Sequence, residues 1–88
     1  MGIGLYVAKL GSMEKFQVTI QEGKEVTQME VEATAPRLAW ELGIKAMGYA
    51  PWKFNTVMDQ AASNTRRVVY TSRGLGDTVL IGLVKPLN

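Results

Sequence analysis

The sequence predicts an α+β domain in which one helix packs against a mainly antiparallel sheet. Segments with the alternation of apolar and polar residues that is typical of strands lie on both sides of a single stretch with helical periodicity. The chain has 88 residues, which is the usual size of one domain, so we expect a single domain over residues 1–88. No apolar run approaches the roughly 20 residues that a membrane-spanning helix needs.

Three strands are expected before the helix. The first, Gly4–Leu10, has the least clear pattern, whereas Lys15–Gln21 alternates cleanly. A short loop follows, in which Gly23 supplies a positive φ for a hairpin. The partner strand is Glu25–Ala33. We expect a bulge or an irregular start near Thr27, because Val26 is out of phase with the other apolar residues.

The helix is expected over Ala35–Met47. Thr34 is the predicted N-cap, Pro36 suits the first turn because its missing N–H costs nothing there, and Gly48 is the predicted stop. Gly43, in the middle of the helix, weakens it by about 1 kcal/mol relative to Ala. A glycine in such a place often permits the close approach of a strand or a partner.

The helix carries more apolar surface than one sheet can cover. One stripe, predicted to face the sheet, contains the residues Leu38, Ala39, Leu42 and Ala46. A second stripe contains Trp40, Ile44 and Met47 and faces away, while Arg37, Glu41 and Lys45 form a polar stripe. Either the rest of the fold covers the second stripe, or it docks a partner or a second copy of the chain.

After the helix, the segment Tyr49–Trp52 forms an aromatic corner that contains a proline. Three further strands are expected, over Lys53–Asp59, Thr65–Arg73 and Thr78–Lys85. The last is apolar on both sides, as is typical of a central, covered strand. The predicted order is therefore β-β-β-α-β-β-β.

The predicted core combines the inward-facing side chains of these elements. It contains Leu38, Leu42, Ala46, Phe16, Val18, Ile20, Met29, Val31, Phe54, Val68, Val79, Ile81 and Leu83. Replacing Leu42 by Ala is expected to cost about 2–5 kcal/mol of stability.

Composition argues against several function classes. The chain contains no His and no Cys, which removes the commonest acid–base group and the ligands that zinc and copper prefer. We therefore expect a protein that is not an enzyme, with no catalytic residues, no cofactor and no metal. The absence of Cys and of a classical secretion signal favours a cytoplasmic or virion-associated location.

Charge is distributed unevenly along the chain. The residues up to Leu42 include four basic and six acidic side chains, and those from Gly43 onward include six basic and two acidic ones. Such an asymmetry can mark a binding face. A basic set with interleaved aromatics contains Lys53, Arg66, Arg67, Tyr70, Arg73 and, close by, Trp52. It suits either single-stranded nucleic acid or ion pairs with Glu30 and Glu32 on a neighbouring strand.

These observations favour a small protein that acts by binding other proteins, as an inhibitor, an adaptor or an assembly component, or by self-association. The expected apolar anchors are Trp40, Ile44, Met47, Tyr49 and Trp52. The alternative function is a nucleic-acid-binding module that uses the basic set. In layout alone, the chain resembles many short phage-encoded and accessory proteins, some of which bind and block a host protein and some of which are virion components.

Overall fold

A computed structural model describes residues 13–87 as one helix and a five-stranded antiparallel sheet, which confirms the α+β fold. The elements are β1 (Glu14–Glu22), β2 (Glu25–Ala33), α2 (Pro36–Ala46), η1 (Pro51–Lys53, a 3-10 turn), β3 (Asn55–Met58), β4 (Val68–Arg73) and β5 (Val79–Pro86). Their order is β-β-α-β-β-β. The first predicted strand, Gly4–Leu10, lies outside the described residues.

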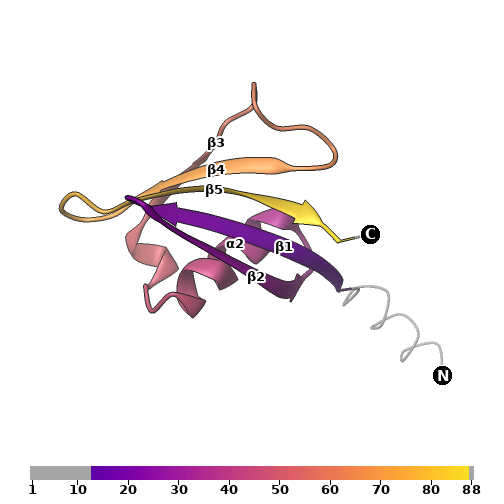
Figure 1. Ribbon diagram of the computed structural model, residues 1–88, viewed down its shortest axis with the longest axis horizontal. Coiled ribbons are helices and arrows are strands. Elements are labelled where there is room, and N and C mark those ends of the chain that lie inside the picture. Colours follow the sequence, from indigo (N-terminus) through magenta and orange to yellow (C-terminus); the bar gives the residue numbers. More distant parts are fainter. Residues whose placement is uncertain (1–12, 88) are drawn as a thin grey trace.

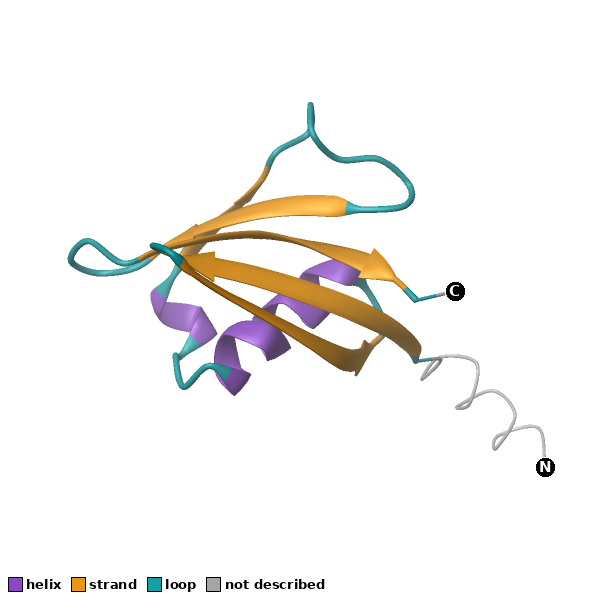
Figure 2. Ribbon diagram, in the orientation of Figure 1, coloured by secondary structure: helices purple, strands orange, loops and turns teal. Residues whose placement is uncertain are grey.

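The strands are arranged in the order β2-β1-β5-β4-β3, and both α2 and η1 lie on one side of the sheet (Figures 1 and 2). Gly23 has a φ of 61°, which confirms the predicted hairpin between β1 and β2. Pairing along this hairpin runs without interruption from Glu22 and Glu25 to Glu14 and Ala33. The prediction of a bulge or an irregular start near Thr27 is therefore wrong.

The helix begins at Pro36, one residue later than the predicted start at Ala35. Ala35 occupies the N-cap position because Pro36 is already helical, and no side chain caps the first turn. The predicted cap Thr34 is therefore wrong. At the other end, Gly48 adopts a φ of 97°, which supports its predicted role as the stop.

The helix presents to the sheet a different face from the one that hydrophobicity predicted, and of the predicted stripe only Ala39 is buried. Trp40 and Ile44 are fully buried, whereas Leu38 and Leu42 remain 46% and 41% exposed. The reason is the close approach at Gly43, where an added Cβ would lie 2.8 Å from Cγ1 of Val18.

Small residues decide this orientation. Ala39 and Gly43 lie one turn apart and are both buried, so the backbone of α2 packs close to β1 on this side. Trp40 and Ile44 flank them and enter the core. A helix turned to place Leu38 and Leu42 against the sheet would bring bulkier side chains to the place of closest approach.

The indole of Trp40 reaches furthest into the core. Its Nε1–H donates a hydrogen bond of 2.8 Å to Oγ of Ser72, a fully buried residue on β4. Oγ of Ser72 also shares a hydrogen bond with Oγ1 of Thr56 on β3. The indole and the Tyr70 ring stack with centroids 5.4 Å apart and planes 28° apart. The helix is thus joined to β4 by packing and by a buried polar contact.

Strand β5 is central in the sheet, as its apolar sequence predicted, but its inward side was misassigned. Val18 pairs with Val84, and Tyr70 pairs with Gly82, so Leu80 and Val84 face the helix. The predicted core residues Val79, Ile81 and Leu83 therefore lie on the other face, where Ile81 is 49% exposed. Since both sides of the strand are apolar, only the pairing with its neighbours decides which side is buried.

The observed core contains Phe16, Val18, Ile20, Ala33, Ala39, Trp40, Ile44, Tyr70, Leu80 and Val84. Six partly buried residues pack against it: Met29, Val31, Met47, Tyr49, Phe54 and Val68. The predicted contributions of Leu38, Leu42 and Ala46 are wrong because the exposed side of α2 carries all three.

We predict that Trp40→Ala destabilises the fold by about 3–5 kcal/mol, because it opens a large cavity and leaves the Ser72 hydroxyl without its donor. Leu42→Ala should cost less than about 1 kcal/mol, contrary to the expectation from sequence, because its side chain is already partly in water. Urea unfolding of the two variants at 25 °C measures the difference. Equal losses of stability would contradict the observed orientation of the helix.

We also predict that Gly43→Ala destabilises the protein by about 1–3 kcal/mol, although Ala is the better helix former by about 1 kcal/mol. The new methyl group would press on Val18 at 2.8 Å and on Ile20 at 3.1 Å, and the stiff χ1 of valine leaves little room to yield. Thermal unfolding measures the effect. A higher melting temperature for the variant would show that the helix can move away from the sheet without loss.

Candidate docking surface

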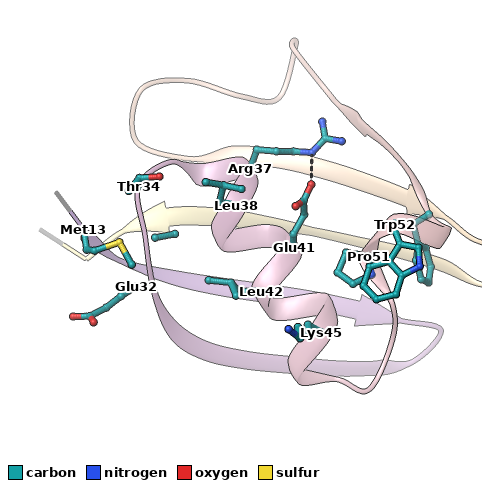
Figure 3. A pocket seen from close by; sticks show the side chains of 12 residues that line it. Met13, Glu32, Thr34, Arg37, Leu38, Glu41, Leu42, Lys45, Pro51 and Trp52 are labelled. Carbon is teal, nitrogen blue, oxygen red and sulfur yellow. Dashed lines mark hydrogen bonds and ion pairs between the residues drawn. The ribbon is translucent and has the colours of Figure 1, made fainter. Parts of the chain in front are cut away.

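Exposed apolar side chains gather along the outer face of α2 and form an open groove of about 550 Å³, which we call the helix-face groove. Its lining comes from Met13 just before β1, from the end of β2 and Thr34 after it, from the helix, and from η1 with the residue that follows. These residues are Met13, Glu32, Ala33, Thr34, Arg37, Leu38, Glu41, Leu42, Lys45, Pro51, Trp52 and Phe54. Figure 3 shows Leu38 and Leu42 between Met13 at one end and Trp52 at the other.

Trp52 is the most exposed of these large apolar residues on the helix side, at 80%. It belongs to η1, which begins at Pro51 directly after the short connection from α2. Proline fixes the backbone at the start of this turn, so the indole is presented on a rigid support. The ring therefore extends the apolar surface of Leu38 and Leu42 beyond the helix itself.

Charged side chains follow the same face of the helix. Nε of Arg37 lies 3.3 Å from Oε2 of Glu41, one turn further on, and Lys45 continues the row. Both members of the ion pair are well exposed, so the pair stabilises the helix only slightly. The groove thus has an apolar centre and a rim of alternating charge, which is the usual composition of a protein interface.

Of the five apolar anchors predicted from sequence, only Trp52 is an exposed side chain. Trp40 and Ile44 are core residues, so the expectation that they face a partner is wrong. Met47 and Tyr49 are partly buried and pack against the core. The rotation of the helix explains the outcome, because it buries Trp40 and Ile44 and leaves Leu38 and Leu42 exposed.

The aromatic corner has a structural role at Tyr49. Its hydroxyl donates a hydrogen bond of 2.6 Å to Oε2 of Glu22, at the hairpin end of β1. Its ring meets that of Phe54 edge to face, with centroids 5.5 Å apart. The hydrogen bond to the carboxylate, together with some burial, raises the pKa of the Tyr49 hydroxyl above its usual value of 10.0. The side chain therefore ties the end of the helix to the first hairpin.

The sequence did not predict that Leu38 and Leu42 are exposed, because it placed them in the core. It also did not predict that Met13 lines the same groove. The signal that could have identified them is the pair Ala39 and Gly43, because small residues one turn apart mark the side on which a helix can approach a sheet most closely. Hydrophobicity alone favoured the leucines for that side.

The basic set does not form a single platform. Tyr70 is 4% exposed and stacks on Trp40, so its ring is not available to a nucleic-acid base. Arg66 and Arg67 lie before β4, while Arg73 is the last residue of this strand, about 20 Å away at the usual rise per residue. Lys53 and Trp52 belong to η1, on the helix side.

The alternative expectation of ion pairs between these arginines and Glu30 or Glu32 is also wrong. Strands β1 and β5 separate β2 from β4 in the sheet, so the two charged strands are not neighbours. Nucleic-acid binding through the arginines alone stays a prediction.

Within residues 13–87, no group of three or more acidic side chains is placed to hold a metal ion. In the same part of the chain, no helix has both the length and the apolar character needed to cross a membrane. Comparison of the chain with protein-family models, with curated proteins and with solved structures finds no match.

We predict that Glu22→Gln lowers the pKa of Tyr49, because the carboxylate that accepts its hydrogen bond raises that pKa. The pKa in the folded protein is above the unfolded value of about 10, so the stability from this contact is complete below about pH 10. It is lost as the pH rises through the folded pKa.

The shift can be measured by NMR titration of labelled tyrosine in the wild type and in Glu22→Gln. Glu30→Gln is the control, because this carboxylate is on β2 and has no hydrogen bond to the ring. The free energy of unfolding, measured from pH 8 to 11, should be higher for the wild type than for Glu22→Gln at pH 8. This difference should decrease at high pH. An unchanged Tyr49 titration in Glu22→Gln would contradict the assignment.

Proposed function

We propose that this is a non-enzymatic protein-interaction protein that docks through the helix-face groove, with a second copy of the same chain as its partner. The observation that carries the proposal is the exposure of Leu38, Leu42 and Trp52 around one groove. Exposed apolar side chains that are scattered singly need no explanation, whereas a contiguous group with a charged rim is typical of an interface. Tryptophan is also among the residues that most often dominate binding energy.

The groove face is suited to pairing with itself. If two helices cross antiparallel about a twofold axis midway between Leu38 and Leu42, Leu38 of each copy meets Leu42 of the other. The same axis brings Arg37 of one copy within one helical turn of Glu41 of the other, since each residue rises about 1.5 Å. Because the axis is twofold, this contact between opposite charges occurs twice, once on each side of the axis.

Non-enzymatic action is supported by the side chains that the chain offers. It has no His and no Cys for acid–base or nucleophilic work. The groove contains the carboxylates Glu32 and Glu41, and Arg37 neutralises the second. A surface of this kind binds by complementarity of shape and charge, which suits the assembly or adaptor role expected from the sequence.

We predict that the wild-type protein self-associates in a concentration-dependent manner and that Leu38→Ser/Leu42→Ser is monomeric at the same concentrations. The substituted side chains are already partly in water in the isolated chain, so the variant should retain most of its stability. Size-exclusion chromatography with light scattering measures the masses.

Val26→Ser/Val57→Ser is the matched control, because these two valines are exposed to 59% and 58% but lie on the opposite face of the sheet. Dimerisation should also protect Trp52 from an aqueous fluorescence quencher, while the buried Trp40 is protected throughout. A wild-type protein that stays monomeric and leaves Trp52 fully open to the quencher would show that a second copy is not the partner.

A further inference from the structure

A second surface, on another part of the molecule, gathers positive charge. It is a hollow of about 770 Å³ that we call the basic hollow, and it is lined by Gln17, Thr65, Arg66, Arg67, Leu83, Lys85, Pro86 and Leu87. Three of these eight residues are cationic and none is acidic. The hollow lies where the connection from β3 to β4 returns to the sheet, beside the end of β5 (Figure 1).

Local hydrogen bonds hold the two arginines in place. The backbone N–H groups of Arg66 and Arg67 donate to Oδ1 of Asn64 at 2.7 and 3.1 Å, and the backbone N–H of Asn64 donates to the carbonyl of Arg67 at 2.8 Å. These bonds close a tight turn over residues 64–67. Because the backbone is ordered by its own contacts, binding needs to order only the side chains.

Within residues 13–87, no carboxylate forms an ion pair with the cations of the hollow. Among the described residues, the ion pair of the protein is Arg37 with Glu41, on the other side of the sheet. Arg66, Arg67 and Lys85 therefore converge on one hollow with no carboxylate in its wall. Convergent like charges repel one another and raise the local positive potential, and a bound anion relieves this repulsion.

We propose that the basic hollow binds the phosphate groups of a compact phosphorylated ligand. Each guanidinium offers a planar pair of N–H donors that matches two phosphate oxygens, and the ammonium of Lys85 adds a point charge. The amide of Gln17 and the hydroxyl of Thr65 are neutral donors in the same wall. This set recognises oxyanions by charge and by several convergent hydrogen bonds.

The surrounding charge limits the size of the ligand. Gln17 pairs with Lys85 on one side and with Glu30 on the other, so the positive region ends one strand beyond the hollow. The positive width therefore spans about three strands and the turn, on the order of 15 Å at the usual strand spacing. One or two phosphate groups fit within it, whereas a long polyanion crossing the sheet would meet the acidic strand β2.

The experiment is calorimetric titration of the intact protein with pyrophosphate at low salt, together with thermal unfolding in its presence. Wild type should bind and should melt at a higher temperature with ligand present. Arg66→Gln/Arg67→Gln should weaken binding by about tenfold or more, and Lys85→Gln by a smaller factor. Arg73→Gln is the control, because this exposed arginine lies at the far end of β4 and does not line the hollow.

A second set of titrations separates the sources of phosphate, with inorganic phosphate, pyrophosphate and single-stranded oligonucleotides of increasing length as probes. We expect pyrophosphate to bind more tightly than phosphate, and oligonucleotide affinity not to rise with length beyond a few nucleotides. Affinity that grows steadily with length would overturn the compact ligand in favour of a polynucleotide. No binding of any probe at low salt, or equal weakening by Arg73→Gln, would overturn the site itself, since phosphate contacts are strongest at low salt.

Discussion

The hydrogen bond from the Trp40 indole to Ser72 fixes the rotation of the helix together with the close approach at Gly43, and much of the surface follows from that rotation. A buried N–H group without an acceptor would cost about 1–3 kcal/mol, and the Ser72 hydroxyl is the acceptor that the sheet provides. The stacking of the same ring on Tyr70 fills the space beneath it. With Trp40 placed in this way, Leu38 and Leu42 can only point away from the sheet.

The backbone approach at Gly43 acts in the same direction. An alanine side chain at this position would collide with Val18, so the helix lies unusually close to β1 along its small-residue side. A tight contact on one side and bulky leucines on the other leave an apolar surface that residues 13–87 do not cover. The helix-face groove is therefore a consequence of how the core is packed, and Trp52 on η1 enlarges it.

The order of the strands places the acidic and the basic side chains of the sheet in separate regions of the molecule. Strand β2 contains Glu25, Glu30 and Glu32 and lies at one edge, while Arg66 and Arg67 lie near the opposite edge, with β1 and β5 between them. Glu25, Glu30 and Glu32 therefore cannot form ion pairs with Arg66 and Arg67. Each remains available for contact with something else, and the basic hollow is where the positive charges converge.

The fold class, the hairpin at Gly23, the helix to within one residue at each end and the central place of β5 could all be predicted from the sequence. They depend on local periodicity and on residues with special backbone preferences. The sequence also indicated that the helix has two apolar stripes, which is more apolar surface than one sheet can cover. Which face is buried depended on contacts between residues far apart in the chain, such as Trp40 with Ser72 and Gly43 with Val18. The buried face of the helix could not be predicted, since hydrophobicity ranks side chains by polarity and carries no information on how closely two backbones approach. The grouping of Arg66, Arg67 and Lys85 likewise depends on the order of the strands in the folded sheet.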